Sequence, residues 1–381
     1  MGRNPTILFV VNDPAFFLSH RLSIARAGKR RGVEIHVATP LEDCVKCIKD
    51  EGFIHHPLKL KKHGTSIIFE LITIIGIYRI FKSLKPDLVH LVTIKPVIYG
   101  GIAARLSKIP SVVSAISGLG HLFIDRGVVV SILRKIAMYG YRLALKHPCQ
   151  KVIFQNSDDL NFFLKYKLVD KSKTIIIKGS GVDVDLFLPT QTPAGPPIVL
   201  LAGRMQWEKG IATFVQAAKK ILQLGVLARF VLVGGRDSWN VSTIPLATLD
   251  EWQKEGVVEW WGRQSNMPEI LGSSTLVCLP SHREGLPKVL IEAAACGKAI
   301  VATDVPGCRE VVLDGENGLL VPAENVDALV DALIKLLKDV PLRISMGKVG
   351  RELAVNQFCQ ALVVDQTFEV YDSLFKQINM K

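Results

Sequence analysis

Short runs of β-branched and aliphatic residues alternate, in the first half of the chain, with longer stretches that repeat apolar positions at helical spacing. Strands that alternate with helices pair in parallel and are covered on both faces, so this half predicts a doubly wound α/β domain. The expected strands are Ile7–Val11, Glu34–Ala38, Leu88–Val92, Ser111–Ile116, Lys151–Phe154 and Thr174–Ile177, and the expected helices include Leu18–Arg30, Ile67–Leu84 and Val128–Leu145.

The alternation stops at residues 189–197, where four prolines in nine residues and no apolar period indicate a linker. It then resumes, and the stretch from Val326 onward has a helical pattern. We therefore expect an N-terminal domain at 1–188 and a C-terminal domain at 198–381, whose last helix is free to pack back on the first domain. Two doubly wound domains bind ligands in a cleft at the carboxyl ends of their strands. The expected second-half elements are strands Ile198–Ala202, Phe230–Val233, Val257–Trp260, Leu276–Leu279 and Ala299–Ala302, with helices Ile211–Leu224 and Val289–Ala295.

Composition agrees with a folded protein of two cores, because 381 residues include 49% hydrophobic and 22% charged side chains. The longest apolar stretch, Ile67–Phe81, is interrupted by charges and falls short of a bilayer span. No secretory signal precedes the first strand, so a cytoplasmic location is expected. Seven cysteines do not make a disulfide framework. Cys44 and Cys47 form a C-x-x-C near His55 and His56, for which a surface helix is favoured over a metal or redox site.

The net charge of +12 indicates an anionic partner, for which nucleic acid, an acidic membrane surface and phosphorylated substrates all qualify. A nucleic-acid binder is disfavoured, because no recognition-helix cluster or basic stripe with interleaved aromatics is found. A dehydrogenase is also disfavoured, since no G-x-G-x-x-G follows the first strand of either half.

The sharpest chemical pattern is the segment Pro280–Gly297, in which a strand, a Gly/Pro turn and a helix follow one another. The helix is expected to start near Pro287 and to offer the N–H groups of Leu286, Lys288 and Val289 to a diphosphate. Glu284 stands before the helix and Glu292 about two turns further on. Carboxylates accept hydrogen bonds from vicinal hydroxyls, which suits ribose and sugar rings, although a capping acid and a solvated helix acid remain the alternative.

A second pattern, Ala202–Gly210, follows the first strand of the second half. Gly203 allows a tight turn close to a ligand. Arg204 and Lys209 lie in the strand-to-helix loop, where two cations suit a diphosphate, with two ordinary solvated bases as the alternative.

Together these segments resemble family 4 of the glycosyltransferases, whose fold is GT-B: two Rossmann-like domains facing each other across a cleft. The resemblance covers nearly the whole chain, and the Glu-x7-Glu pattern is its most specific part. The matching residues are Gly203-Arg204 with Lys209-Gly210, Val233-Gly234-Gly235, Trp261-Gly262, Glu284-Gly285-Leu286-Pro287 with Glu292, and more weakly Ser19-His20-Arg21, Pro86–His90 and Gly181–Asp183.

The resemblance is strongest to bacterial transferases that build cell-surface glycans on polyprenyl-diphosphate carriers. It implies a retaining transferase that needs no metal or cofactor, with a nucleotide-diphosphate sugar as donor and UDP with an N-acetylhexosamine favoured. Arg204 and Lys209 would hold the donor diphosphate and offset the charge of the leaving group. Glu284 would contact the donor sugar and Glu292 the ribose. Asp183 and Asp185 form an Asp-x-Asp, interpreted as turn and capping chemistry rather than a metal site.

The first half departs from the family pattern at two places. Asn12–Ala15 replaces a Gly-Gly loop, and Ser117 stands where relatives place a sugar-contacting histidine, so His121 is a candidate replacement. Gly118 indicates a close backbone approach to substrate. On the same acceptor side, His20 and Arg21 are expected to begin the first helix. They are candidates for a base and a contact to an acceptor phosphate, respectively, and a capping pair at the helix start is the alternative. Lys95 poses the same choice.

The nearest alternative enzymes are a GT-B epimerase or phosphorylase, which would share the diphosphate site. The helical pattern of Val128–His147 contains several basic residues, among them Arg134 and Lys135. The same domain has further positive charge at Lys59, Lys61 and Lys62. We expect peripheral attachment to an anionic membrane on its cytoplasmic face, near a polyprenyl-diphosphate-linked or glycan acceptor. A core helix with solvated bases is the alternative.

Overall fold

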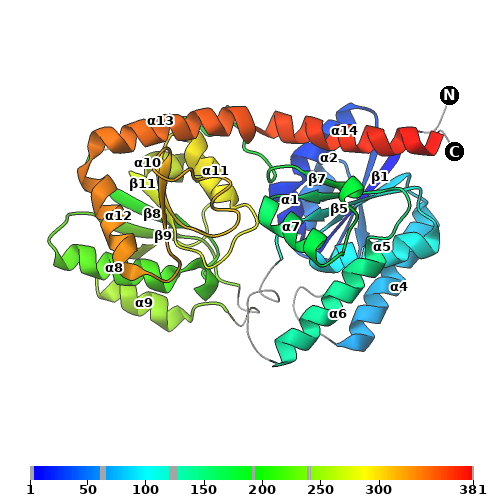
Figure 1. Cartoon of the computed structure of the whole chain (residues 1–381), viewed down its shortest axis with the longest axis horizontal. Coiled ribbons are helices and arrows are strands. Elements are labelled where there is room, and N and C mark those ends of the chain that lie inside the picture. The colour runs from blue at the N-terminus through cyan, green and yellow to red at the C-terminus, as the bar shows by residue number, and fades with distance from the viewer. Residues whose placement is uncertain are drawn as a thin grey trace. The chain divides into compact units, whose positions relative to one another are not determined.

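The chain divides into two compact units in a computed structural model that describes residues 4–60, 66–119, 128–190, 194–237, 240 and 242–379 (Figure 1). The first unit contains residues 1–180 together with 361–381, and the second unit contains residues 181–360. Each unit has its own parallel sheet.

The division differs from the expected one at the start of the second unit. Residues 181–188, expected in the first domain, belong to the second unit because the backbone of Val182 is hydrogen-bonded to the end of that unit: its N–H donates to Phe358 O at 2.8 Å, and Gln360 N–H donates to Val182 O at 2.9 Å. Residues beyond 360 belong to the first unit, which is the packing back of the last helix that the sequence left open.

The first unit has a seven-stranded parallel sheet in the order β3-β2-β1-β4-β5-β6-β7. Its elements are β1 (Thr6–Val11), α1 (Pro14–His20), α2 (Leu22–Arg30), β2 (Glu34–Thr39), α3 (Val45–Asp50), β3 (Ile54–Pro57), α4 (Ile67–Leu84), β4 (Leu88–Val92), α5 (Ile94–Ser107), β5 (Ser111–Ile116), α6 (Val128–Ala144), β6 (Gln150–Phe154), α7 (Ser157–Lys165), the short 3-10 helix η2 (Lys171–Lys173), β7 (Thr174–Ile176) and, after the second unit, α14 (Gln360–Asn379).

Alternate residues of β1 belong to two different cores, as the period of a strand buried on both sides requires. Ile7, Phe9 and Val11 pack with α1, α2, α3 and α14, whereas Leu8 and Val10 pack with α4, α5, α6 and α7. Helix α14 is thus a full member of the first unit.

The second unit has a six-stranded parallel sheet in the order β10-β9-β8-β11-β12-β13. Helices α8, α9 and α12 share one core with the sheet, and α10, α11 and the end of α13 share the other. Its elements are β8 (Ile198–Ala202), η3 (Trp207–Lys209), α8 (Ile211–Gln223), β9 (Arg229–Val233), α9 (Leu246–Lys254), β10 (Glu259–Trp260), α10 (Met267–Ser273), β11 (Leu276–Leu279), α11 (Lys288–Ala295), β12 (Ala299–Thr303), β13 (Gly318–Val321), α12 (Val326–Lys338) and α13 (Val340–Gln357).

Both sheets reverse their strand order once, between β1 and β4 in the first unit and between β8 and β11 in the second. Ligands of open α/β sheets bind outside the carboxyl ends of the strands at such a switch point. The two sharpest sequence patterns follow β8 and β11 directly, so both lie at the switch point of the second sheet.

Candidate active site

Two loops of the second unit, one after β8 and one after β11, approach each other at a distance that only glycine permits. Gly210 has a φ of +70°, and a Cβ there would stand 1.8 Å from the carbonyl oxygen of Pro280. Gly234, after β9, has a φ of +145°, and its Cβ would stand 1.7 Å from Gly203 O. These glycines fix the positions of the backbone that carries the candidate donor residues.

The approach brings Lys209 and Glu284 into an ion pair. Lys209 Nζ donates to Glu284 Oε1 at 2.6 Å, although the two residues are 75 positions apart in the chain. Only 18% of the lysine and 11% of the glutamate side chain is exposed. An ammonium group has three donors, so Lys209 can keep this bond and still donate to a ligand. The structure thus joins two of the three predicted catalytic residues.

Arg204, the third, lies in the same loop, and its side chain is exposed. That side chain makes no hydrogen bond or ion pair with the other described residues. Gly203, next to it, donates its N–H to Val233 O at 2.8 Å, which ties the loop to β9. Arg204 therefore projects a free guanidinium from a backbone that is itself held in place.

Helix α11 starts at Lys288, one residue after the expected Pro287, which serves as its N-cap with extended backbone angles. Leu290 N–H donates to Pro287 O at 3.1 Å, and the amides before it have no intrahelical acceptor by geometry. Gly285 and Leu286 precede the cap, so the segment directs the positive end of the helix dipole toward the loop after β11.

Glu292 is almost fully buried, with 9% of its side chain exposed, and its Oε1 lies 3.1 Å from Lys288 Nζ. Burial raises the pKa of Glu292, while the ammonium group of Lys288 opposes that rise. The sequence favoured a ligand as its partner; the structure supplies Lys288, one helical turn earlier. A ribose that binds Glu292 would have to share it with this lysine.

Two buried polar side chains of the same loops were not singled out from the sequence. Gln206 and Ser281 are both 0% exposed, and neither amide atom of Gln206 nor Ser281 Oγ has a hydrogen-bond partner among the described residues. Buried polar groups are normally satisfied, so these atoms are candidates to bind a polar group of a ligand. No sequence signal marks them, because glutamine and serine are ordinary loop residues.

On the first unit, the loop after β1 lacks the glycines of a phosphate loop and is instead closed by Asp13. Its Oδ1 accepts hydrogen bonds from Ala15 N at 2.8 Å and Phe16 N at 3.3 Å. The carboxylate occupies the place that an anionic ligand would take at the start of α1. Helix α1 begins there and ends at His20, so the prediction that His20 begins this helix is wrong.

His20 nevertheless lies at the accessible end of α1. Its ring stacks on Phe16 with 4.0 Å between ring centroids, and Ser19 Oγ lies 2.7 Å from its Nδ1. These contacts hold the imidazole in one orientation, as a base or hydrogen-bond partner requires.

Arg21, by contrast, is turned into the unit and is only 3% exposed. Its Nη1 donates to His20 O at 2.9 Å, and burial lowers its pKa to about 10. Nearby, His90 Nδ1 lies 2.5 Å from the hydroxyl of Tyr371 on α14. In this placement Arg21 supports the backbone of His20 and has no surface at which to meet an acceptor phosphate.

Lys95 is in the first turn of α5, after β4, and pairs with Glu70 of α4 at 2.6 Å. Thr93, which caps α5, has a φ of +74°. A β-branched residue is strained there, and such strain clusters at functional sites. Lys95 thus stands at the switch point between β1 and β4.

Ser117 and Gly118 follow β5, the next strand of the sheet. Ser117 Oγ is buried and has no hydrogen-bond partner among the described residues, and Gly118 has a φ of +125°. His121 lies outside the described residues.

Within the described part of the chain, no group of three or more His, Cys, Asp or Glu side chains is placed to hold a metal ion. Asp183 Oδ1 accepts hydrogen bonds from Asp185 N and Leu186 N, both at 3.1 Å, so the turn predicted for this Asp-x-Asp is confirmed. Cys44 caps the short helix α3, on which Cys47 lies.

Comparison with known proteins finds glycosyltransferases that match both halves of the chain. Residues 6–156 match the model "Glycosyl transferase 4-like" and residues 196–339 match "Glycosyl transferases group 1". The chain is 29% identical, over 95% of its length and 99% of the relative's, to N,N'-diacetylbacillosaminyl-diphospho-undecaprenol alpha-1,3-N-acetylgalactosaminyltransferase of Campylobacter jejuni. It is 26% identical, over 80% of both chains, to UDP-Gal:alpha-D-GlcNAc-diphosphoundecaprenol alpha-1,3-galactosyltransferase of Escherichia coli.

Among solved structures, sucrose-phosphate synthase of Thermosynechococcus elongatus matches with a TM-score of 0.81 at 21% identity, covering 98% of this chain and all of that one. This match shows the GT-B fold, with two parallel-sheet units, as the sequence predicted. Both family models describe glycosyltransferases and together they match most of the chain, so the chain is a glycosyltransferase.

Proposed function

We propose that this glycosyltransferase moves an N-acetylhexosamine from UDP to a lipid-linked sugar or glycan acceptor in cell-surface polysaccharide synthesis, with retention of configuration and without a metal. The Lys209–Glu284 pair beside the start of α11 carries the proposal. It places a cation, a carboxylate and a helix N-terminus within one pair of loops.

Donor cleavage leaves negative charge on the nucleoside diphosphate, and this site offers positive charge from three directions. Lys209 is held by Glu284, Arg204 is free to move onto a phosphate, and the helix N-terminus adds a partial charge. Preorganised charges of this kind do the work that a divalent metal does elsewhere. Glu284, oriented by the lysine, is then free to accept a sugar hydroxyl with its second oxygen, and Glu292 to accept the ribose.

The names of the relatives guide the choice of substrates. Both names contain an alpha-1,3 linkage and an undecaprenol diphosphate, and one of them names UDP-Gal as the donor. UDP-hexoses carry the sugar as the α anomer, so an α product means retention. On the acceptor side we assign the base to His20, the phosphate contact to Lys95 rather than Arg21, and the sugar contact to Ser117, Gly118 or His121.

Membrane attachment of the first unit is supported by its charge and by exposed apolar side chains. That unit has 30 Lys and Arg against 15 Asp and Glu, whereas the second has 17 against 20. On α6, Ile132, Ile136 and Tyr139 are all more than half exposed, and α4 exposes an apolar stripe of Ile68, Leu71, Ile72 and Ile75. None of the helices in the described residues is long and apolar enough to cross a bilayer. We propose peripheral binding to an anionic cytoplasmic leaflet.

A donor screen tests the reaction. UDP-N-acetylhexosamines should raise the melting temperature more than GDP-sugars, since ligand at a hundred times its dissociation constant adds about 2.7 kcal/mol. The hit should then glycosylate a polyprenyl-diphosphate-linked sugar in the presence of EDTA, with the α configuration seen by proton NMR. A β product contradicts retention. Epimerisation of the donor, or its phosphorolysis without transfer, would establish the alternative enzymes instead.

Liposome flotation tests the membrane site. The wild-type chain should float with anionic vesicles, and less so as salt is added. Replacement of Arg134 and Lys135 by Glu should weaken flotation, whereas the same change at Lys335 and Lys338, on α12 of the second unit, should not. Equal binding to neutral vesicles, or none to either kind, refutes the membrane site and leaves the donor assignment intact.

A further inference from the structure

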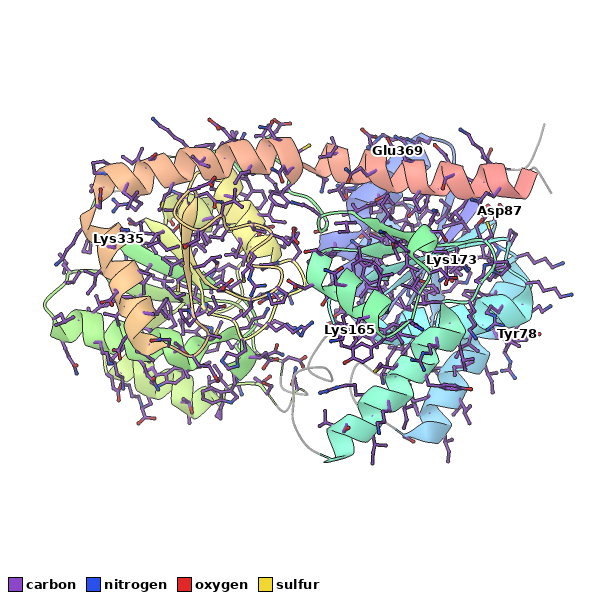
Figure 2. All side chains as sticks on the ribbon, in the orientation of Figure 1. Tyr78, Asp87, Lys165, Lys173, Lys335 and Glu369 are labelled. Atoms are coloured by element: carbon purple, nitrogen blue, oxygen red, sulfur yellow. The ribbon has the colours of Figure 1, made fainter. Side chains whose placement is uncertain are left out.

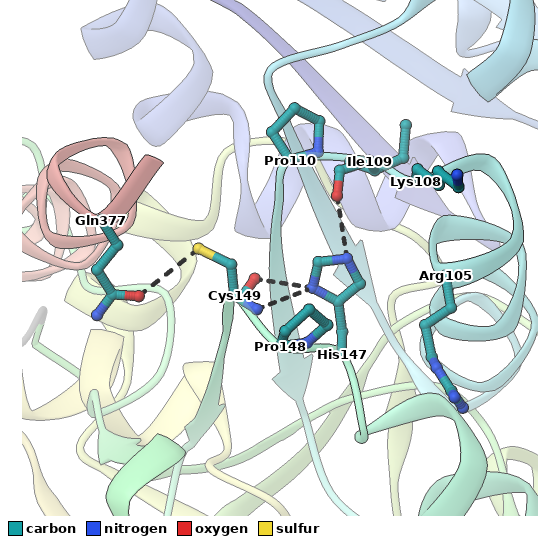
Figure 3. A pocket seen from close by; sticks show the side chains of 8 residues that line it. All are labelled: Arg105, Lys108, Ile109, Pro110, His147, Pro148, Cys149 and Gln377. Atoms are coloured by element: carbon teal, nitrogen blue, oxygen red, sulfur yellow. Dashed lines mark hydrogen bonds between the residues drawn. The ribbon is translucent and has the colours of Figure 1, made fainter. Parts of the chain in front are cut away.

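A cavity of about 370 Å³ opens on the first unit where the chain enters β5 and β6 (Figure 3). One wall is the end of α5 and the turn into β5, with Arg105, Lys108 and Pro110. The residues before β6, 147–149, and Gln377 of α14 complete it. This volume falls within the range of small-molecule sites and has room for roughly a dozen waters at about 30 Å³ each.

The cavity lies at the opposite edge of the sheet from the acceptor-side residues. Lys108 and His147 precede β5 and β6, whereas Lys95 and Ser117 follow β4 and β5. Strands of a parallel sheet share one direction, so the two sets belong to opposite edges. Neither the donor nor the acceptor site therefore accounts for the cavity.

Positive charge collects around it without carboxylate partners. Among the described residues, neither Arg105 nor Lys108 forms an ion pair; Arg105 Nη1 only donates to the backbone oxygen of Leu143 at 2.9 Å. Lys173, labelled in Figure 2, donates from Nζ to His147 O at 2.9 Å and brings a third cation close. By contrast, Lys95 and Lys209 each have a glutamate within 2.6 Å.

His147 is a buried side chain in the wall of the cavity. It is 3% exposed, and its Nε2 and Nδ1 each lie 3.0 Å from a backbone oxygen, of Ile109 and Cys149 respectively. Burial lowers its pKa, the two carbonyls oppose that shift, and the charges of Lys173 and Arg105 lower it further. The His147 side chain lines the cavity together with Ile109 and the two prolines.

We infer that this cavity is a binding site for a small organic phosphate, of the size of a sugar phosphate. Arg105 and Lys108 would bind the phosphate at the rim, since charge-assisted hydrogen bonds are the strong ones and a guanidinium can bind two oxygens at once. The carbon skeleton would pack on Ile109, Pro110 and Pro148. The same cations also offset the negative end of the α5 dipole, and the experiment below separates the two roles.

Binding here has a consequence for α14, the helix that returns from the second unit. Cys149 Sγ lies 3.6 Å from Gln377 Oε1 and 3.8 Å from Leu374 O, so the cavity wall is in contact with the last turns of α14. An occupant that contacts Gln377 and the segment before β6 together would hold this end of the helix on the first unit. We therefore assign the site a regulatory role, with α14 as the element that it stabilises.

Hydrogen exchange with ribose 5-phosphate and inorganic phosphate as probes tests the site on the full chain. Ribose 5-phosphate should slow exchange in residues 105–110, 146–150 and 372–378, and phosphate alone should do so more weakly. Lys108→Glu, at an exposed position, should raise the apparent dissociation constant of the probe, measured from this protection, about tenfold or more. Lys46→Glu, an equal charge change on exposed α3, should leave it unchanged.

Arg204→Ala serves as the control for the donor site, where the same probes can bind. Protection of the three segments should survive in this variant, whatever happens to donor binding. Protection confined to residues 203–210 and 284–290, or unaffected by Lys108→Glu, overturns the proposal. So does an absence of protection at millimolar probe when circular dichroism shows each variant folded, since the cations then serve only the helix end.

Discussion

Removing the ammonium group of Lys209 is the most direct test of how this enzyme stabilises its leaving group. In the structure Lys209 Nζ lies 2.6 Å from Glu284 Oε1, and less than a fifth of each of the two side chains is exposed. Loss of one preorganised charge from such a site costs about 2–4 kcal/mol in the barrier. Because each 1.4 kcal/mol is a factor of ten, Lys209→Ala should lower kcat/KM by about 30- to 1000-fold.

The same substitution leaves the mostly buried Glu284 carboxylate without its partner, which costs about 1–3 kcal/mol of stability. Glu284→Gln removes that unpaired charge and keeps the side chain's shape. In a double-mutant cycle, adding Glu284→Gln to Lys209→Ala should therefore restore much of the lost stability. It should not restore turnover, since the charge on the leaving group is still unmet.

Steady-state kinetics of the three variants, with urea melts on the same samples, measure both quantities. EDTA should change none of the rates. Wild-type turnover in Lys209→Ala would refute the diphosphate assignment. Recovery of turnover in the double variant would show that the loss in Lys209→Ala came from the unpaired Glu284 carboxylate and not from the missing positive charge.

Three further outcomes follow from particular contacts. Gly210→Ala should lower both the melting temperature and donor binding, because its Cβ would lie 1.8 Å from Pro280 O. Gly235→Ala should have a mild effect, because its Cβ would lie 3.6 Å from the nearest atom. Equal shifts in melting temperature would contradict the role of the close approach. Glu292→Gln should mainly raise KM for the donor in initial-rate assays, and a fall in kcat alone would argue against a ribose contact. Burial holds the pKa of His90 well below its usual value. As the pH falls below 6.5, His90 therefore takes up a proton in the unfolded chain but not in the folded one. This difference should lower the free energy of unfolding by up to about 1.4 kcal/mol per pH unit. In urea melts at pH 7 and 5.5, the free energy of unfolding of His90→Gln should fall less between the two pH values than that of the wild type.

Most strands were predictable because parallel strands buried on both faces leave continuous apolar runs. Leu88–Val92, Ser111–Ile116 and Ile198–Ala202 were delimited to the residue. The two strands that were missed, β3 and β13, are edge strands. The first of these, Ile54–Pro57, has no fully buried residue, so no apolar run marks it.

The candidate site was predictable where neighbours in sequence carry the chemistry and was not where distant residues meet. The loops around Lys209 and Glu284 were found, since Gly and Pro punctuate both. The bond between them joins residues 75 apart, and Arg21 interacts electrostatically with Tyr371, which lies on α14. Periodicity within one segment has no information on such contacts.

The return of α14 to the first unit sets the order in which the two units can be completed during translation. Val363, Phe368, Tyr371 and Leu374 of α14 belong to the core that also contains β1, yet they are made last. The two cores of the second unit, residues 181–360, contain only residues of that unit. We expect nascent chains to fold the second unit first, while the first unit keeps an open apolar groove until α14 leaves the ribosome. Truncation before residue 361 should therefore unfold the N-terminal half more than the half to which the deleted helix is joined.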